Sequence, residues 1–103
     1  MSLISKQHQF TQAVSRLLQQ ADALGYQVTF GDAYRDPRCP YGHPTSLHKQ
    51  RLAIDLNVFR EGIYLTRGDQ YADLGAYWEG IGGTWGGRFN DGNHFSFEHN
   101  GTK

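Results

Sequence analysis

The sequence predicts an α+β fold, in which a small antiparallel sheet carries helices on one of its faces. Two stretches repeat apolar residues with the period of a helix, and three shorter ones alternate apolar and polar residues as strands do. The 13 glycines among 103 residues favour turns and tight backbone over a long helical bundle. A chain of this length holds one hydrophobic core, so we expect a single domain over residues 1–103.

Residues 5–24 predict an amphipathic helix. Its apolar positions are spaced by four and three residues and so form one stripe, which consists of Phe10, Val14, Leu17, Ala21 and Leu24. Gly25 follows this stripe and supplies the left-handed residue that commonly ends a helix.

Three stretches predict half-buried strands. Tyr26, Val28 and Phe30 alternate with polar residues and are expected to face the core. The second strand points four apolar side chains to one face, namely Leu52, Ile54, Leu56 and Val58. The third places Phe95 and Phe97 on one face, with His94, Ser96 and Glu98 on the other.

The connecting segments carry turn and cap signals. Arg60-Glu61-Gly62 predicts a hairpin turn into the apolar residues 63–65. Thr66, with Asp69 three residues on, predicts the cap of a second helix that ends at Gly82-Gly83. Its apolar side comprises Leu74, Tyr77, Trp78 and Ile81. We expect loops at residues 36–47, which contain all three prolines, and at residues 84–93.

Charge and composition exclude several classes of protein. Ten basic and ten acidic residues give a net charge of zero, so we expect no nucleic-acid partner. No apolar run has the length of a membrane span or a signal peptide, so we expect synthesis in the cytoplasm without a secretion signal and no membrane insertion. Cys39 is the single cysteine, which excludes an internal disulfide and leaves a thiol with no identifiable base beside it.

The strand pattern places a carboxylate and an imidazole away from the core. Asp55 and His94 project from the sheet face opposite the apolar side chains, and His48 lies just before the second strand. Two imidazoles and one carboxylate are a typical catalytic zinc set, with a fourth position for water, although other divalent ions also bind such ligands. We therefore expect Zn2+ on the face opposite the helices, and we expect His8, His43 and His99 to be solvated.

A zinc site of this kind also needs a general acid and base. Asp91 lies three residues before His94 in a glycine-flanked loop, where it can reach the metal without binding it, and it is the preferred candidate. Glu98 is the alternative, because it is expected to share a sheet face with His94.

The order of these motifs resembles the zinc D-alanyl-D-alanine peptidase family. The motifs are Ser46-x-His48, Ala53-x-Asp55 and Asp91-x-x-His94-Phe95. This family includes D-Ala-D-Ala carboxypeptidases and dipeptidases and the L-alanyl-D-glutamate endopeptidases of phage endolysins, and it shares its zinc fold with hedgehog domains and lysostaphin-type peptidases. Arg51 stands where the family motif has a glycine. An arginine is tolerated at this position if the backbone of residue 51 has an ordinary negative φ.

The resemblance implies a function and further site residues. Arg35, in a segment similar to the family's strand that ends in an arginine, would bind a substrate carboxylate or polarise the scissile carbonyl. Ser46 would contact the substrate or support the site. The implied activity is a peptidase of the peptidoglycan stem peptide, cutting L-alanyl-D-glutamate or, second, D-alanyl-D-alanine. The resemblance also implies a phage or prophage lysis protein that acts at the bacterial cell wall or periplasm. We expect this protein to be a monomer.

Other interpretations stay open from the residues alone. A zinc-containing module that binds peptide or cell-wall fragments without cleaving them would use the same ligands. The segment "GNHFSFEHN" suggests a histidine-metal nuclease, but that class needs a helix after the hairpin for its last ligand. Arg35 could also serve only as an ion-pair partner of Asp32 or Asp36, and Asp55 could be a structural carboxylate.

Overall fold

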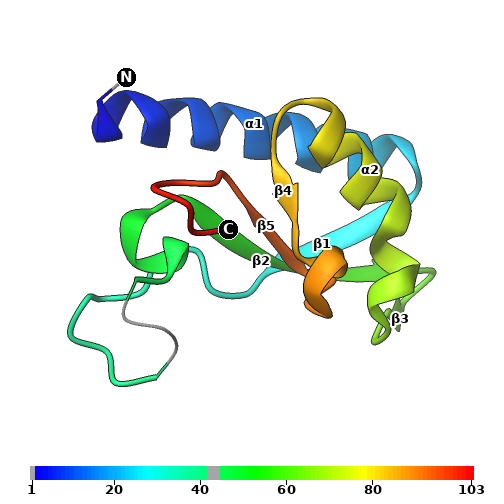
Figure 1. The fold of residues 1–103 in the computed structure, drawn as a ribbon. Helices are drawn as coiled ribbons and strands as arrows, with labels where there is room; N and C mark the ends of the chain where they lie inside the picture. The colour runs from blue at the N-terminus through cyan, green and yellow to red at the C-terminus, as the bar shows by residue number, and fades with distance from the viewer. Residues whose placement is uncertain (1, 42–44) are drawn as a thin grey trace.

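The α+β fold is confirmed by a computed structural model of the protein, which describes residues 2–41 and 45–103 (Figure 1). The described residues form two helices and five strands: α1 (Leu3–Ala23), β1 (Tyr26–Phe30), β2 (Ala53–Arg60), β3 (Ile63–Tyr64), α2 (Ala72–Gly80), β4 (Thr84–Trp85) and β5 (His94–Ser96). Three short 3₁₀ turns join them: η1 (Leu47–Gln50), η2 (Gly68–Tyr71) and η3 (Gly86–Phe89).

The sheet is antiparallel and is built around β2. Its strand order is β1-β2-β5-β4, and β3 pairs with the end of β2 as a hairpin. The predicted turn is confirmed, since Arg60 and Ile63 are paired and the two residues between them have φ values of 51° and 79°. Such positive values at both central positions match the twist of a two-residue hairpin.

Both helices pack on one face of the sheet, as Figure 1 shows. Trp78 of α2 is fully buried at their junction, where it meets the ring of Phe10 from α1 and that of Phe95 from β5 edge to face. Its indole Nε1 donates a hydrogen bond of 3.0 Å to the carbonyl of Ser96. The predicted apolar side of β2 is also confirmed, because these four residues are at most 5% exposed: Leu52, Ile54, Leu56 and Val58.

Three predictions about the fold are wrong. Phe30 is 63% exposed, because β1 is an edge strand and its last side chain has a neighbouring strand on one side only. Thr66 does not cap the second helix, which begins through η2 with Arg67 at the N-cap and the side chain of Gln70 accepting from its backbone N–H. The predicted loop 84–93 contains β4 and η3, which are too short to show a periodic pattern.

We predict that Gly75→Ala destabilises the protein by about 1–3 kcal/mol, the usual cost of overfilling a packed core. A Cβ at this buried position of α2 would lie 2.1 Å from the ring of Trp85. Gly80→Ala on the same helix is the control, since nothing lies within 4 Å of its Cβ, and its stability should change by less than about 1 kcal/mol. Urea unfolding of both variants measures the difference, and equal midpoints would contradict the close contact.

Candidate metal centre

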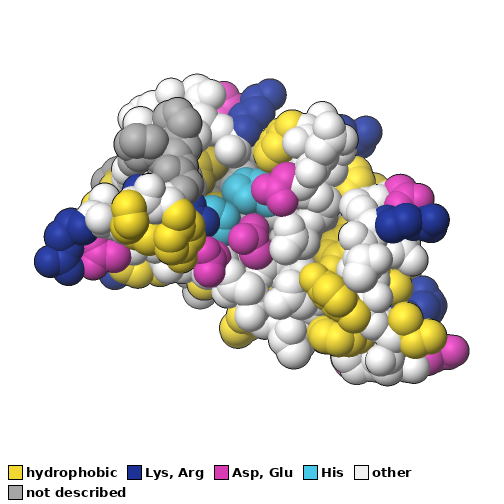
Figure 2. Space-filling view, turned by 90° about the horizontal axis from the view of Figure 1, so that it is seen from below, with side chains coloured by type: hydrophobic (Ala, Val, Ile, Leu, Met, Phe, Trp, Pro, Cys, Tyr) yellow, Lys and Arg dark blue, Asp and Glu magenta, His cyan; other side chains and the backbone are white. Residues whose placement is uncertain are grey.

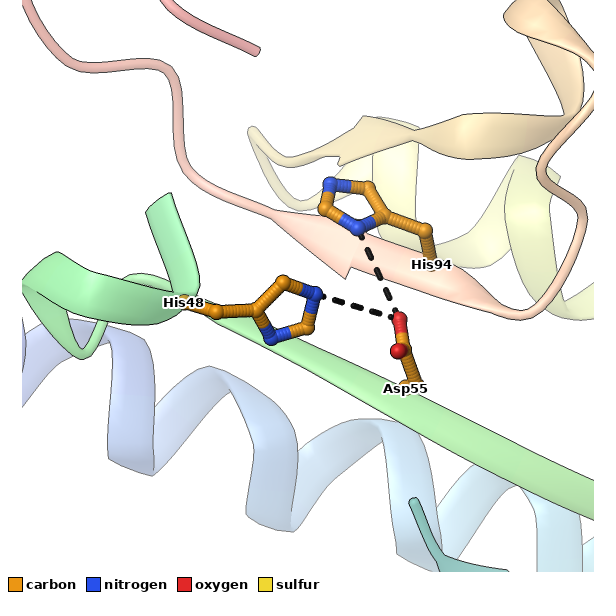
Figure 3. A group of neighbouring side chains, drawn as sticks. All are labelled: His48, Asp55 and His94. Atoms are coloured by element: carbon orange, nitrogen blue, oxygen red, sulfur yellow. Dashed lines mark ion pairs between the residues drawn. The ribbon is translucent and has the colours of Figure 1, made fainter. Parts of the chain in front are cut away.

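Three side chains gather in a hollow on the sheet face that the helices leave uncovered. Figure 2 shows the histidines at the bottom of this hollow with acidic side chains beside them, and Figure 3 shows His48, Asp55 and His94 pointing toward one another. They come from η1, β2 and β5. The site therefore joins two elements that are neighbours in sequence, η1 and β2, with β5, which is distant from both.

Sheet register brings Asp55 and His94 together. They are direct partners in the antiparallel pairing of β2 with β5, so their side chains leave the sheet on the same face. The next pair on that face, Ala53 with Ser96, is fully buried. The prediction that Asp55 and His94 lie off the main core is confirmed, although His94 is only 6% exposed.

His48 reaches the site from the turn η1. The hydroxyl oxygen of Ser46 caps this turn by accepting from the backbone N–H of His48 at 3.3 Å. The His48 carbonyl in turn accepts from the backbone N–H of Arg35 at 3.1 Å. His48 is 4% exposed, so two backbone contacts and burial hold its ring over the end of β2.

The facing atoms are spaced as metal ligands. Asp55 Oδ1 lies 3.3 Å from His48 Nε2 and 3.6 Å from His94 Nδ1, and the three ligand atoms all lie within 4.8 Å of one another. In a tetrahedral zinc site with bonds of about 2.0–2.2 Å, ligand atoms are separated by roughly 3.3–3.6 Å. Asp55 Oδ1 is buried without a hydrogen-bond partner among the described residues, a state that a bound cation would relieve. The three residues therefore fit a divalent metal ion.

The same neighbours keep Asp55 ionised. Burial acts to raise the pKa of its carboxyl group, but the contacts with His48 and His94 outweigh burial and lower the pKa to about 2. A carboxylate that stays charged at neutral pH is the form that binds a metal ion.

Asp91 stands at the edge of the centre. Its Oδ2 lies 3.8 Å from His94 Nδ1, and its side chain is 51% exposed. Backbone bonds fix this position, since the N–H of Asp91 donates to Gly86 and that of His94 donates to the Asp91 carbonyl. Glu98, the alternative base, lies beyond the end of β5, is exposed, and accepts at its backbone carbonyl from Lys6 of α1.

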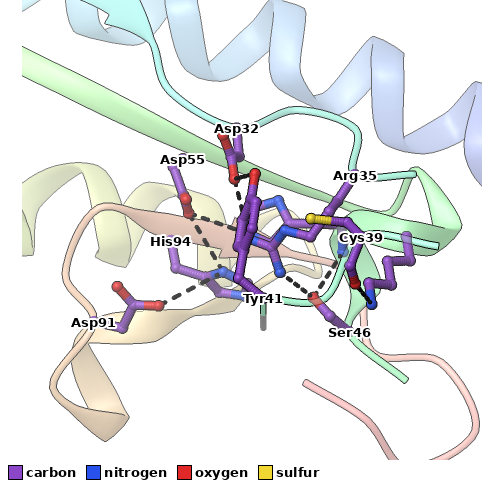
Figure 4. A network of polar contacts seen from close by, with 10 residues as sticks. Asp32, Arg35, Cys39, Tyr41, Ser46, Asp55, Asp91 and His94 are labelled. Atoms are coloured by element: carbon purple, nitrogen blue, oxygen red, sulfur yellow. Dashed lines mark hydrogen bonds and ion pairs between the residues drawn. The ribbon is translucent and has the colours of Figure 1, made fainter. Parts of the chain in front are cut away.

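Arg35 lies on the other side of the metal ligands from Asp91, as Figure 4 shows. Its side chain is 11% exposed, and its guanidinium donates to Asp32 Oδ2 at 3.1 Å and to the Ser46 hydroxyl at 3.4 Å. The ring of Tyr41 covers it, with 4.7 Å from Cζ to the ring centroid. Its Nε is buried and has no hydrogen-bond partner in the part of the chain that the structure describes. The ion pair with Asp32 thus exists, and the guanidinium still keeps a donor unpaired near the site.

The sequence interpretation missed Tyr41 and treated Asp32 only as a surface partner. The hydroxyl of Tyr41 approaches Asp32 Oδ2 at 3.4 Å, so both residues hold the arginine. No sequence spacing signals a ring that folds back from a loop.

The other described histidines, His8 and His99, are not part of the group of three candidate ligands. His8 is exposed on α1, His99 Nδ1 lies 3.4 Å from Lys6 Nζ, and His43 lies outside the described residues.

Arg51 corrects one expectation about the turn between the ligands. Its φ of 57° and ψ of 33° are left-handed, not the ordinary negative φ that would accommodate an arginine without strain. Its guanidinium stacks on the ring of Tyr34 at 4.1 Å, and its backbone N–H closes η1 on the carbonyl of His48 at 3.4 Å. These contacts offset the cost of the conformation, and the turn that presents His48 is kept.

A family model for D-alanyl-D-alanine carboxypeptidases matches residues 41–97, more than half of the chain. The chain belongs to this family. The matched segment contains His48, Asp55, Asp91 and His94, whereas Arg35 lies before it. No curated protein matches the chain. Membership confirms the resemblance and supports a zinc peptidase acting on peptidoglycan peptides. None of the described helices is long and apolar enough to cross a membrane.

We predict that the chain binds one zinc ion through these side chains. His48→Ala should weaken zinc binding by more than about 100-fold. Removing a residue that hydrogen-bonds to a metal ligand typically lowers metal affinity by about 10–100-fold, and removing the ligand itself should lower it further. His8→Ala, which removes an exposed imidazole from α1, should leave the affinity unchanged. Competition with a chromophoric chelator measures both constants, and equal affinities for the two variants would place the metal elsewhere.

Proposed function

We propose that this protein is a zinc peptidase that cleaves the stem peptide of bacterial peptidoglycan. One observation carries the proposal: three side chains with ligand spacing share an open hollow with a carboxylate 3.8 Å from one of them. Family membership supplies the substrate class. His48, Asp55 and His94 are proposed as the ligands, since their facing atoms lie within 4.8 Å of one another.

Zinc held by these residues would supply a Lewis acid for a carbonyl oxygen and would lower the pKa of water toward about 7. The protein side chains perform the proton transfers and hold the substrate. We assign the general base to Asp91, whose exposed carboxylate takes the proton of the attacking water and later gives it to the leaving amine nitrogen. Its place beside His94, and the place of Glu98 beyond the strand, favour Asp91 in this role.

Arg35 is proposed to bind the oxygen that becomes negative, or a carboxylate of the substrate. Its planar donors suit both groups, and its buried Nε has no hydrogen-bond partner in the described chain. Asp32, Ser46 and Tyr41 hold the guanidinium from three sides, so little of its freedom remains to be lost when the substrate binds. Ser46 also caps η1, the turn that carries His48. We therefore propose that Ser46 supports the geometry of the site and does not serve substrate binding alone.

The proposed bond is L-alanyl-D-glutamate, as in the compact phage enzymes of this kind, with D-alanyl-D-alanine second. A protein of this activity would work at the cell wall or periplasm, and the proposed source is a phage or prophage that delivers it there.

We predict that Asp91→Ala lowers hydrolysis of purified peptidoglycan by about 10²–10⁴-fold, the usual contribution of a general acid–base group, while zinc stays bound. Glu98→Ala is the matched control and should retain activity, because its carboxylate lies beyond β5. Mass spectrometry of the released peptides, with and without EDTA, identifies the bond. Bound zinc with no release by the unmodified protein would indicate a binding module, and loss of activity in Glu98→Ala alone would reverse the assignment.

A further inference from the structure

A groove borders the site on the side of Asp91, and its other lining residues have no role in the chemistry described above. It has a volume of about 640 Å3, and its walls include Thr66, Arg67, Gly68, Asn90, Asp91 and Asn93. The volume lies within the range of about 300–1,000 Å3 that is typical of ligand-binding clefts. Asp91 belongs to both the groove and the metal centre, so the two are continuous.

Backbone and buried contacts hold the two walls of the groove together. Gly68 and Gly92 join its two walls, since a Cβ on Gly92 would lie 2.4 Å from the Cα of Gly68. Only glycine lets the backbones of η2 and of the loop before β5 approach this closely. Trp85 Nε1 donates to the carbonyl of Gly92 at 2.7 Å and anchors the second wall to β4. Because these contacts are between backbone and buried atoms, the close approach of the two walls does not depend on the position of a long side chain.

The walls offer neutral hydrogen-bonding groups. Thr66, Asn90 and Asn93 carry a hydroxyl and two amides, which can donate to and accept from a peptide backbone. Arg67 and Asp69, which are both exposed, pair at 3.3 Å and largely cancel in charge. A groove with these walls suits an extended peptide better than an anion or an apolar chain.

The chemistry of Asp91 decides which part of the substrate lies there. In the proposed function, on which this inference rests, Asp91 gives its proton to the leaving amine nitrogen, so the leaving group must lie beside Asp91. Arg35 lies on the other side of the metal ligands (Figure 4). The chain that begins with the leaving nitrogen therefore runs from Asp91 into the groove.

We infer that the groove between η2 and residues 90–93 binds the leaving peptide, with room for several residues beyond the cleaved bond. A single alanine would leave most of its 640 Å3 to water, so binding energy accrues only with a longer leaving chain. The structure thus assigns an endopeptidase specificity to the site, since a carboxypeptidase releases one residue.

Synthetic stem peptides that release one, two or three residues test this inference. We expect kcat/KM to rise about tenfold or more from the shortest to the longest leaving chain. Thr66→Trp, at an exposed position in the groove wall, should narrow the groove and remove most of this gain, so that the three substrates are cleaved with similar kcat/KM. Thr11→Trp on α1 is the matched control and should behave as the unmodified protein. No dependence on length, or an equal loss for all three substrates in Thr66→Trp, would overturn the inference.

Binding of the released tripeptide separates this inference from the proposed function. It should shift the amide NMR signals of residues 66–68 and 90–93, and Thr66→Trp should weaken the effect. Shifts at these amides without cleavage of any substrate would support the groove and refute the peptidase. Cleavage with no shifts there would support the peptidase and refute the groove.

Discussion

The antiparallel pairing of Asp55 with His94 is the constraint on which the site depends. A two-residue period fixes both side chains on the face away from the helices as soon as Leu56 and Phe95 enter the core. A slip of one residue would bury the carboxylate among apolar side chains and expose the core of β2. The hydrophobic pattern that stabilises the sheet therefore also orients two of the three ligands.

The third ligand depends on a different kind of interaction. His48 lies outside the strands, and local hydrogen bonds hold η1: the cap from Ser46, the turn closed at Arg51 and the backbone bond to Arg35. Each of these is worth about 1 kcal/mol, and Leu47, which is 2% exposed, also anchors η1 in the core. The same segment positions Ser46 against Arg35, which couples the arginine to the metal centre through one turn.

The sequence was sufficient for the parts of the structure that periodicity controls. The stripe of α1, the alternation along β2 and the separation of Asp55 from the core all follow from the burial of apolar side chains, which a single sequence records. Periodicity carries no information about two-residue strands such as β4 or about the left-handed φ of Arg51. Contacts between loops, such as Tyr41 over Arg35, depend on chain reversals that leave no local pattern. The groove escaped prediction for the same reason, because its walls come from two separate loops.

Two glycines allow backbone segments to pack directly behind the residues of the site. The number of glycines in the sequence indicated turns, but Gly31 and Gly86 have another function behind the ligands. A Cβ on Gly31 would lie 3.1 Å from that of Asp55, and one on Gly86 would lie 2.2 Å from the Asp91 carbonyl and 2.7 Å from the Cβ of His94. Larger residues would push the adjacent loop away from a ligand or from the proposed base. Since the relative position of Asp91 and His94 sets where a proton can be taken and delivered, the missing side chain at Gly86 is as much a requirement of the proposed chemistry as the carboxylate itself.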